Sequence, residues 1–265
     1  MLNIVVPMAG RGSRFVAEGY KDPKPLISVG GRPMIEWVIE NIRPKRAHRF
    51  IFICLAAHLD LYPEIASKLE SLCPNCVIIR IESVTEGAAC TVLLAKKLID
   101  AKDPLMIANS DQIVDLNIDE YLSRGDSMGV DGVIMTFWSD HPKWSFCRML
   151  DDGSIAEVVE KKVISNEATV GIYNFSRGSD FVRSAESMIK MNDRVNGEFY
   201  VAPCYNRLIS DGARIVAVRT GREYAGMYGL GIPSDLEVFK TTDYFKTREN
   251  RSDVSEQDMS RDCGL

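Results

Sequence analysis

The chain has 265 residues, 46% hydrophobic and 26% charged, so it can bury a substantial core as one globular domain, with or without a small annex. Its formal net charge of −5 argues against a surface built to hold a nucleic-acid backbone, and no apolar run approaches the roughly 20 residues of a membrane-spanning helix. Residues 1–8 read as a strand without a charged leader, so we expect a cytoplasmic protein with no nucleic-acid or membrane partner; a homo-oligomer is compatible with this composition.

The predicted elements of the first half alternate strands with helices. Apolar runs are followed by segments with helical spacing; for instance, a helix can begin at Pro33 and must end before Pro44. This alternation is typical of a parallel sheet covered by helices on both faces. Strands are predicted at 2–8, 49–55, 77–81 and 105–108, and helices at 33–43, 61–72 and 88–99.

Short strand-like runs separated by turn residues dominate the second half, which predicts a mixed or antiparallel continuation of the sheet. The fold class is therefore α/β, with a mixed, mostly parallel central sheet flanked by helices. No linker rich in Pro, Gly or Ser divides the chain, so we predict one domain over 1–246 and a polar C-terminal tail over 247–265. Strands are predicted at 132–137, 146–150, 155–160, 170–175 and 214–218, and helices at 180–191, 203–210 and from 234 onward.

Seven cysteines at irregular spacing favour reduced thiols over a disulfide framework. Cys73 and Cys76 have the spacing of a redox pair or of half a zinc site, but the sequence has no second such pair and only three histidines. We therefore interpret residues 73–76 as a turn between a helix and a strand.

The loop after the first strand, Ala9-Gly10-Arg11-Gly12-Ser13-Arg14, is followed by Pro23-Lys24-Pro25. Glycines after a strand let backbone N–H groups approach an anion, and Arg14 and Lys24 can add positive charge where a triphosphate lies. Neither the dinucleotide-binding fingerprint nor the P-loop pattern is complete. On the glycines alone, a surface turn with solvated basic side chains is an equal alternative.

The string from Gly10 to Ile35, with Pro23-Lys24-Pro25-Leu26 and Gly31-Arg32-Pro33-Met34-Ile35, resembles the signature of the sugar-phosphate nucleotidyltransferase family. The resemblance extends from about Leu2 to Phe239 and implies the Rossmann-like nucleotidyltransferase fold that is shared with the A-type glycosyltransferases. It also implies a nucleotide-binding half over 1–115 and an acceptor-binding half over 116–246. The positions that match the family's NTP site are Met8, Ala9, Gly10, Arg11, Gly12, Ser13, Arg14, Lys24, Glu86, Gly87 and Ala88.

The segment Thr85-Glu86-Gly87-Ala88-Ala89 resembles the family's base- and ribose-facing stretch, although Glu86 replaces a Gln that is often found near there. Gly87 can leave a flat surface for a base, and the alternative is close packing at the start of a helix. Asp111 follows the strand at 105–108, and the carboxyl ends of parallel strands are where open α/β sheets bind ligands. We predict that Asp111 holds Mg²⁺, the alternative being an N-cap.

Glu160-Lys161 resembles the family's acceptor-binding pair, the alternative being a solvent-exposed ion pair. Gly171 is expected to leave room for a ligand. The family's second metal-binding Asp is replaced by Gly229, so Glu198 or Asp235 are the candidates for that role. The predicted acceptor-binding residues are Trp144, Glu160, Lys161, Gly171, Glu198 and Tyr200.

The segments at 85–90, 141–145 and 196–201 most resemble those of a capsule-associated branch, which includes a CTP:phosphoglutamine cytidylyltransferase. The resemblance implies attack by an acceptor phosphate oxygen on the α-phosphorus of CTP, with UTP and dTTP as alternatives, and release of pyrophosphate. The predicted catalytic residues are Arg14, Lys24, Asp111 and Lys161, with Mg²⁺ as cofactor. A sugar-1-phosphate thymidylyl- or uridylyltransferase, a glycosyltransferase and a non-catalytic nucleotide-binding module are the alternatives.

Overall fold

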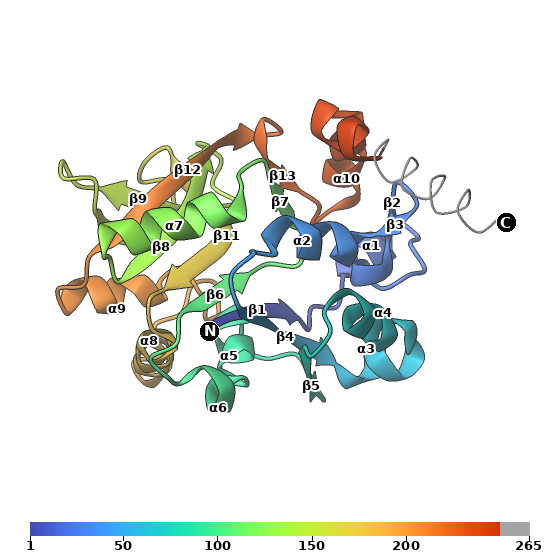
Figure 1. Cartoon of the computed structure of the whole chain (residues 1–265), viewed down its shortest axis with the longest axis horizontal. Coiled ribbons are helices and arrows are strands. Elements are labelled where there is room, and N and C mark those ends of the chain that lie inside the picture. Colours follow the sequence, from blue (N-terminus) through green and yellow to red (C-terminus); the bar gives the residue numbers. More distant parts are fainter. Residues whose placement is uncertain (250–265) are drawn as a thin grey trace, which may run out of the picture.

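The computed structural model describes residues 1–249 as helices packed around one large mixed sheet (Figure 1). The strand order is β5-β4-β1-β6-β11-β8-β12-β13-β7, with a β9–β10 hairpin attached through β11. The strands are β1 (Leu2–Met8), β4 (His48–Leu55), β5 (Val77–Ile81), β6 (Leu105–Ala108), β7 (Gln112–Val114), β8 (Gly132–Trp138), β9 (Ser145–Met149), β10 (Ile155–Glu160), β11 (Glu167–Phe175), β12 (Ile215–Glu223) and β13 (Gly226–Gly229); β2 (Ser28–Val29) and β3 (Arg32–Pro33) pair separately. The helices are α1 (Ser13–Ala17), the 3₁₀ turn η1 (Lys24–Leu26), α2 (Met34–Ile42), α3 (Ala56–Leu61), α4 (Glu64–Leu72), α5 (Ala88–Leu93), α6 (Lys96–Ile99), α7 (Ile118–Met128), α8 (Gly178–Lys190), α9 (Cys204–Ser210) and α10 (Pro233–Thr241).

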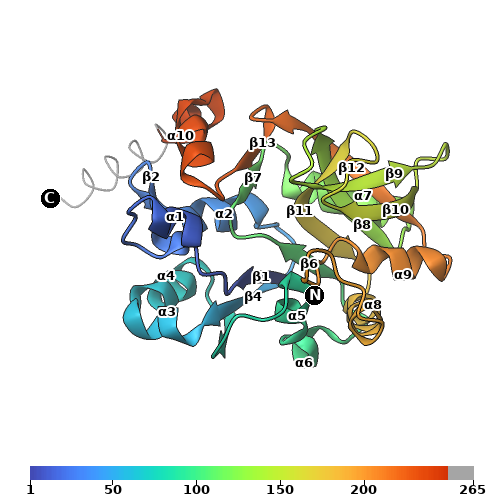
Figure 2. The same cartoon turned by 180° about the vertical axis from the view of Figure 1, so that it is seen from behind.

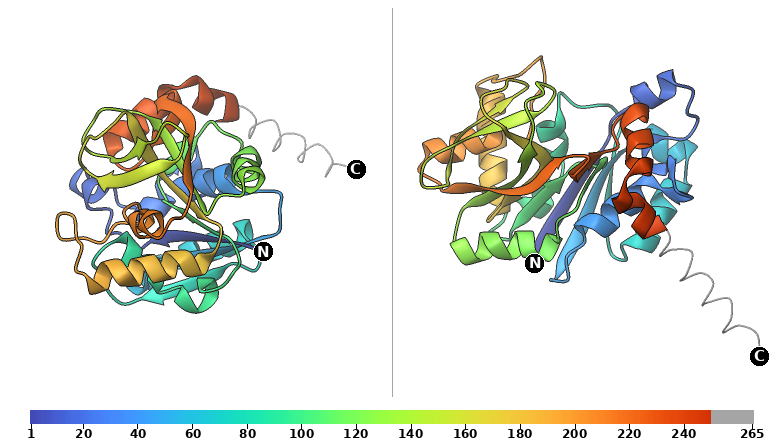
Figure 3. Two further views of the ribbon diagram at one scale, coloured as in Figure 1. Left: turned by 90° about the vertical axis from the view of Figure 1, so that its left-hand side faces the viewer. Right: turned by 90° about the horizontal axis from the view of Figure 1, so that it is seen from above.

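The first half is a parallel sheet whose strands are buried on both faces. β1 pairs in parallel with β4 on one side and with β6 on the other. Because side chains alternate along a strand, Val6 packs into a core shared with α2, α4 and α7, whereas Val5 packs into a second core shared with α5, α6, α8 and α9. Figures 2 and 3 show α7 and α8 on opposite sides of the sheet. This burial explains the continuous apolar runs of the sequence.

The second half of the chain continues the same sheet, but some of its strands run antiparallel to their neighbours. β11 runs antiparallel to both β6 and β8, and β12 returns parallel to β8. β13 then pairs with β7, so that Gly229 lies opposite Gln112. The predicted fold class, a mixed and mostly parallel sheet flanked by helices, is confirmed. The division into a nucleotide half and an acceptor half stays a prediction.

Several predicted boundaries differ from the structure. The helix predicted at 61–72 begins only at Glu64, because Pro63 lacks an N–H and restricts Tyr62 before it, and a separate helix, α3, precedes it at Ala56–Leu61. The predicted helix at 88–99 is divided into α5 and α6. Helix α7 was not predicted, although Asn117 caps it by accepting hydrogen bonds from the N–H groups of Asp119 and Glu120.

The C-terminal boundary also differs. Residues 243–249 are helical, and Phe245 is buried with its ring stacked on Trp37 at a centroid distance of 5.4 Å. Residues 247–249 continue this helix, and the rest of the predicted tail lies outside the described residues. Cys73 and Cys76 lie at the turn between α4 and β5 as free thiols, as expected. Within residues 1–249, no helix is long and apolar enough to cross a membrane.

Candidate active site

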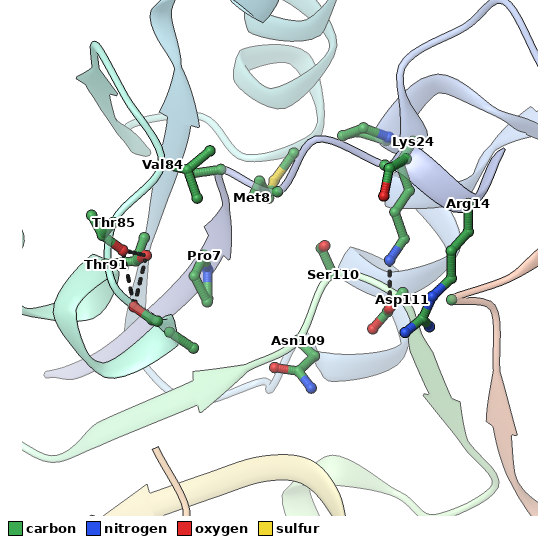
Figure 4. A pocket seen from close by; sticks show the side chains of 18 of the residues that line it. Pro7, Met8, Arg14, Lys24, Val84, Thr85, Thr91, Asn109, Ser110 and Asp111 are labelled. Carbon is green, nitrogen blue, oxygen red and sulfur yellow. Dashed lines mark hydrogen bonds and ion pairs between the residues drawn. The ribbon is translucent and has the colours of Figure 1, made fainter. Parts of the chain in front are cut away.

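A cleft of about 490 Å³ opens where β1 and β6 end (Figure 4). Both strands are parallel, so the loops that follow them meet at one edge of the sheet. One loop is the glycine-containing segment after Met8, and the other is Asn109-Ser110-Asp111. The cleft is lined by Pro7, Met8, Ala9, Gly10, Gly12, Ser13, Arg14, Lys24, Pro25, Val84, Thr85, Gly87, Ala88, Thr91, Asn109, Ser110, Asp111, Glu198 and Gly231.

Charged side chains gather at one end of this cleft. Arg14 projects from α1, Lys24 from the turn η1, and Asp111 from the loop between β6 and β7 (Figure 4). The opposite end, with Val84, Thr85 and Thr91, carries no charged side chain among the labelled residues. The two basic side chains at the first end fit the phosphates of an anionic ligand. Of the predicted nucleotide-binding residues, Arg11 is exposed and does not line the cleft.

Lys24 and Asp111 form an ion pair in which the Lys24 ammonium donates to Oδ2 of Asp111. The two residues are 87 positions apart in the sequence, and their side chains are 22% and 20% exposed. The backbone carbonyl of Asp111 accepts the N–H of Leu230 at 2.7 Å, which ties the loop to the segment after β13. The strand β7 begins at the next residue, so Asp111 does not cap a helix. The N-cap alternative is therefore wrong.

The residues around Asp111 fit a magnesium ion that arrives with a nucleotide. Mg²⁺ in phosphate-transfer sites is held by one or two carboxylates, and substrate phosphates and water complete its coordination. Asp111 supplies one carboxylate, beside Asn109 and Ser110. Among residues 1–249, no three His, Cys, Asp or Glu side chains form a ready-made cation site. A metal site built by the protein alone is thus not part of the described chain.

The two candidates for a second metal ligand lie in different surroundings. Glu198 lines the cleft and is exposed to solvent. Asp235 does not line it: Oδ1 of Asp235 accepts the Tyr224 hydroxyl at 2.7 Å. Oδ2 of Asp235 lies 3.5 Å from the point where a Cβ at Gly229 would be, so Asp235 occupies the space beside the replaced position.

The end of the cleft near Thr85 and Thr91 is tightly packed around Gly87. Gly87 lines the cleft at φ 130°, and a Cβ there would lie 2.4 Å from the carbonyl oxygen of Phe199. Close packing therefore describes Gly87, and a flat surface for a base stays a prediction. The hydroxyls of Thr85 and Thr91 are 2.6 Å apart beside it. Glu86, in contrast, lies outside the cleft lining, because its carboxylate is held by Arg194 at 3.2 Å.

A polar cluster lies along β9, β10 and the segment before α9. The Glu160 carboxylate is buried and accepts a hydrogen bond from the Ser145 hydroxyl; burial raises its pKa above the usual value. The exposed Lys161 donates to the Tyr200 hydroxyl at 2.7 Å, which raises the pKa of Lys161. Glu160 and Lys161 are therefore not a simple exposed ion pair, since their strongest contacts are with Ser145 and Tyr200.

Two predicted acceptor-binding residues have mainly structural contacts. A Cβ at Gly171 would lie 2.3 Å from Nδ2 of Asn109 and 2.4 Å from Oε1 of Gln112, so the space beside Gly171 is filled by these amides rather than left for a ligand. The expectation of an open space there is wrong. Trp144 packs edge-to-face on Phe137 at 5.1 Å, and its buried indole N–H has no hydrogen-bond partner.

Several residues of the site were not predicted. Asn109, Ser110, Thr85 and Thr91 line the cleft. Their position directly after a strand or next to Gly87 was a usable signal, because the neighbouring residues had been assigned to the site. Arg194 and Ser145 carried no such signal, since their partners are distant in the sequence.

A family model described as nucleotidyl transferase matches residues 4–201. The chain belongs to the nucleotidyl transferase family. This confirms the predicted family and the prediction of a nucleotidyltransferase enzyme at the level of the family. Members of this family generally use a divalent metal.

Relatives of this nucleotidyl transferase include the bifunctional protein GlmU of Thermotoga maritima, 26% identical over 233 residues that cover 85% of the chain and 48% of GlmU. The catalytic subunit beta of mannose-1-phosphate guanylyltransferase from Danio rerio is 24% identical over 180 residues, which cover 66% of the chain and 50% of that protein. The chain thus spans about half the length of the curated relatives it matches.

Solved structures agree with this assignment. The nucleoside-diphosphate-sugar pyrophosphorylase of Vibrio cholerae superposes with a TM-score of 0.75 at 27% identity, covering 89% of this nucleotidyl transferase and 98% of that chain. The inositol-1-phosphate CTP transferase of T. maritima has a TM-score of 0.66 at 14% identity, covering 90% and 96%. The second similarity shows a shared fold alone.

Proposed function

We propose that this nucleotidyl transferase transfers a nucleoside monophosphate from an NTP to a small phosphorylated acceptor and releases pyrophosphate. The observation that carries the proposal is the meeting of Arg14, Lys24 and Asp111 at one end of a cleft whose other end includes Val84, Thr85 and Thr91. The triphosphate lies at the charged end, and the base lies toward Thr85, Gly87 and Thr91.

The basic residues at the charged end and Asp111 have different tasks. Arg14 and Lys24 compensate the charge of the triphosphate while the α-phosphorus is attacked and pyrophosphate leaves. Lys24 serves as the counter-ion of Asp111 in the free protein, and it is free to contact phosphate when Asp111 engages a cation. Asp111, with Asn109 and Ser110 beside it, holds Mg²⁺, which when bound neutralises phosphate charge and orients the triphosphate.

The acceptor lies on the side of Glu160, Lys161, Glu198 and Tyr200. Lys161 binds the acceptor phosphate, and Glu160 accepts a hydrogen bond from an acceptor hydroxyl or amide. The acceptor phosphate is already anionic at neutral pH, so its oxygen attacks without a general base in the protein. Holding two anions together is therefore the main task of the cleft.

CTP is the nucleotide that we propose first, with a phosphoamide or phospho-alcohol acceptor and a role in capsule or surface-polysaccharide precursors. The resemblance of the segments at 85–90, 141–145 and 196–201 to the capsule-associated branch supports this choice. A sugar 1-phosphate with UTP or dTTP is the second candidate, which the similarity to the nucleoside-diphosphate-sugar pyrophosphorylase of Vibrio cholerae favours.

The test is a matrix of CTP, UTP, dTTP, ATP and GTP against phosphorylated sugars, amino alcohols and amides, read by pyrophosphate release with Mg²⁺. We expect turnover with CTP and a phosphorylated amide or alcohol. Turnover only with UTP or dTTP and a sugar 1-phosphate contradicts the choice of CTP. Nucleotide binding without turnover across the matrix contradicts nucleotidyl transfer itself.

A further inference from the structure

Arg194 joins two loops that border the cleft from different parts of the chain. One loop, residues 85–88, contributes Thr85, Gly87 and Ala88 to the cleft lining, and the other, residues 192–200, contributes Glu198. The guanidinium of Arg194 bridges them: Nη2 donates to both carboxylate oxygens of Glu86 at 3.2 Å. We name the segment 192–200 the acceptor hairpin.

The acceptor hairpin is built around a tight two-residue turn. Val195 and Glu198 exchange both backbone hydrogen bonds at 3.0 Å, with Asn196 and Gly197 between them at φ 50° and 83°. Asn-Gly is the preferred pair for such a turn, since both residues tolerate positive φ. The turn therefore directs Glu198 toward the cleft.

Arg194 fastens this hairpin internally as well as to the opposite loop. Its Nε donates to Oδ1 of Asn192 at 2.6 Å, and its Nη1 donates to the carbonyl of Gly197 at 3.0 Å. The guanidinium also stacks over the Phe199 ring, with 4.1 Å from its carbon to the ring centroid. Every nitrogen of the guanidinium thus has a partner, and the planar geometry that allows this is specific to arginine.

Backbone hydrogen bonds also connect the acceptor hairpin to the 85–88 loop. The Phe199 N–H donates to the Glu86 carbonyl at 2.8 Å, and the Ala89 N–H donates to the Phe199 carbonyl at 3.0 Å. Gly87 packs directly against the Phe199 backbone. The two loops therefore touch without intervening side chains, and a shift of one moves the other.

We propose that Arg194 is a positioning residue that locks the acceptor hairpin onto the 85–88 loop, so that the nucleotide and acceptor sides of the cleft act as one preorganised unit. In this arrangement the Glu86 carboxylate binds Arg194 and does not contact the base. The contact between Arg194 and Glu86 does not depend on the proposed function, whereas its effect on catalysis rests on the proposed nucleotidyl transfer. Because an exposed ion pair contributes little to global stability, the loss should be local.

The first measurement is amide hydrogen exchange on the substrate-free protein, which needs no substrate. In Arg194→Ala we expect the amides of Ala89 and Phe199 to exchange about tenfold faster, with the melting temperature lowered by no more than a few degrees. Glu86→Ala should give the same change, and the double variant should add nothing further. The control is Arg148→Ala, which breaks the exposed pair with Glu157 on the β9–β10 hairpin and should leave both amides unchanged.

The second measurement is kinetic, with the substrate pair found in the matrix. We expect Arg194→Ala to raise the KM of both substrates about three- to tenfold while kcat changes less, because a smaller fraction of the protein has the competent cleft. Arg194→Lys should behave like Arg194→Ala, since an ammonium cannot bridge the same partners. Unchanged exchange at Ala89 and Phe199 overturns the proposal. Full activity in Arg194→Lys together with wild-type kinetics in Glu86→Ala also overturns it, since Arg194 then acts on substrate by charge alone. An inactive wild type with the expected exchange pattern contradicts only the nucleotidyl transfer.

Discussion

Replacing Asp111 with Asn tests the residue on which the proposed chemistry depends. Asn keeps the size of the side chain and one acceptor oxygen, but it removes the charge that attracts Mg²⁺ and Lys24. Loss of preorganised electrostatic stabilisation at one group costs about 10²- to 10³-fold in kcat, or roughly 3–4 kcal/mol. We therefore expect kcat to fall by about this factor, with partial recovery at raised Mg²⁺.

The stability cost of the same substitution is much smaller. The Lys24–Asp111 pair is about one-fifth exposed on each side, so its loss should cost about 1 kcal/mol. For a domain of this size, that lowers the melting temperature by about 2–4 °C. A large fall in kcat with such a small shift separates a functional from a structural role.

The assay is pyrophosphate release as a function of Mg²⁺ concentration, with a thermal melt of each variant. Asp115→Asn is the matched control, because Asp115 lies just after β7, is mainly exposed and forms only a long ion pair with Arg248, at 3.9 Å. We expect this control to retain nearly full activity. Near-normal, Mg²⁺-dependent turnover by the Asp111→Asn variant would refute the assignment.

Three further predictions follow from the described contacts. Lys24→Ala should lower kcat/KM by about 10²-fold or more, measured by pyrophosphate release, whereas the exposed Lys21→Ala should not; activity within about twofold of wild type would place Lys24 outside the phosphate site. Gly171→Ala should destabilise the fold by about 2–4 kcal/mol in chemical denaturation, because its φ is 97° and its Cβ would collide with Asn109 and Gln112. The control Gly153→Ala, at φ 80° with open space around it, should lower the free energy of unfolding less. Equal losses in the two variants would contradict the packing argument. Burial raises the folded-state pKa of Glu160, so its contribution to stability is present below the unfolded value of about 4.3 and is lost as pH rises through the raised pKa. The melting temperature of Glu160→Gln relative to wild type should therefore increase between about pH 4 and pH 7, and a constant difference would contradict a raised pKa.

Local sequence patterns predicted much of the fold and some of the residues that line the cleft. The apolar run at 2–8 and the glycines after it predict a strand followed by a loop, and both features depend on neighbouring residues alone. The position of Asp111 three residues after β6 was also predictable, because the carboxyl end of a parallel strand is set by strand direction. Element boundaries were less accurate where proline or a cap decided them, as at Pro63 and Asn117.

The amino-acid sequence by itself determined the α/β class, the family and the loops after β1 and β6, which line the cleft, because periodicity and short motifs encode these features within a few residues. Only the tertiary structure decided that Lys24 pairs with Asp111, that Asn109 fills the space beside Gly171, and that Glu86 turns away from the cleft to Arg194. Each of these outcomes is a choice of partner between residues far apart along the chain. Such a choice depends on distance and burial after the strands have paired, and no local pattern contains it.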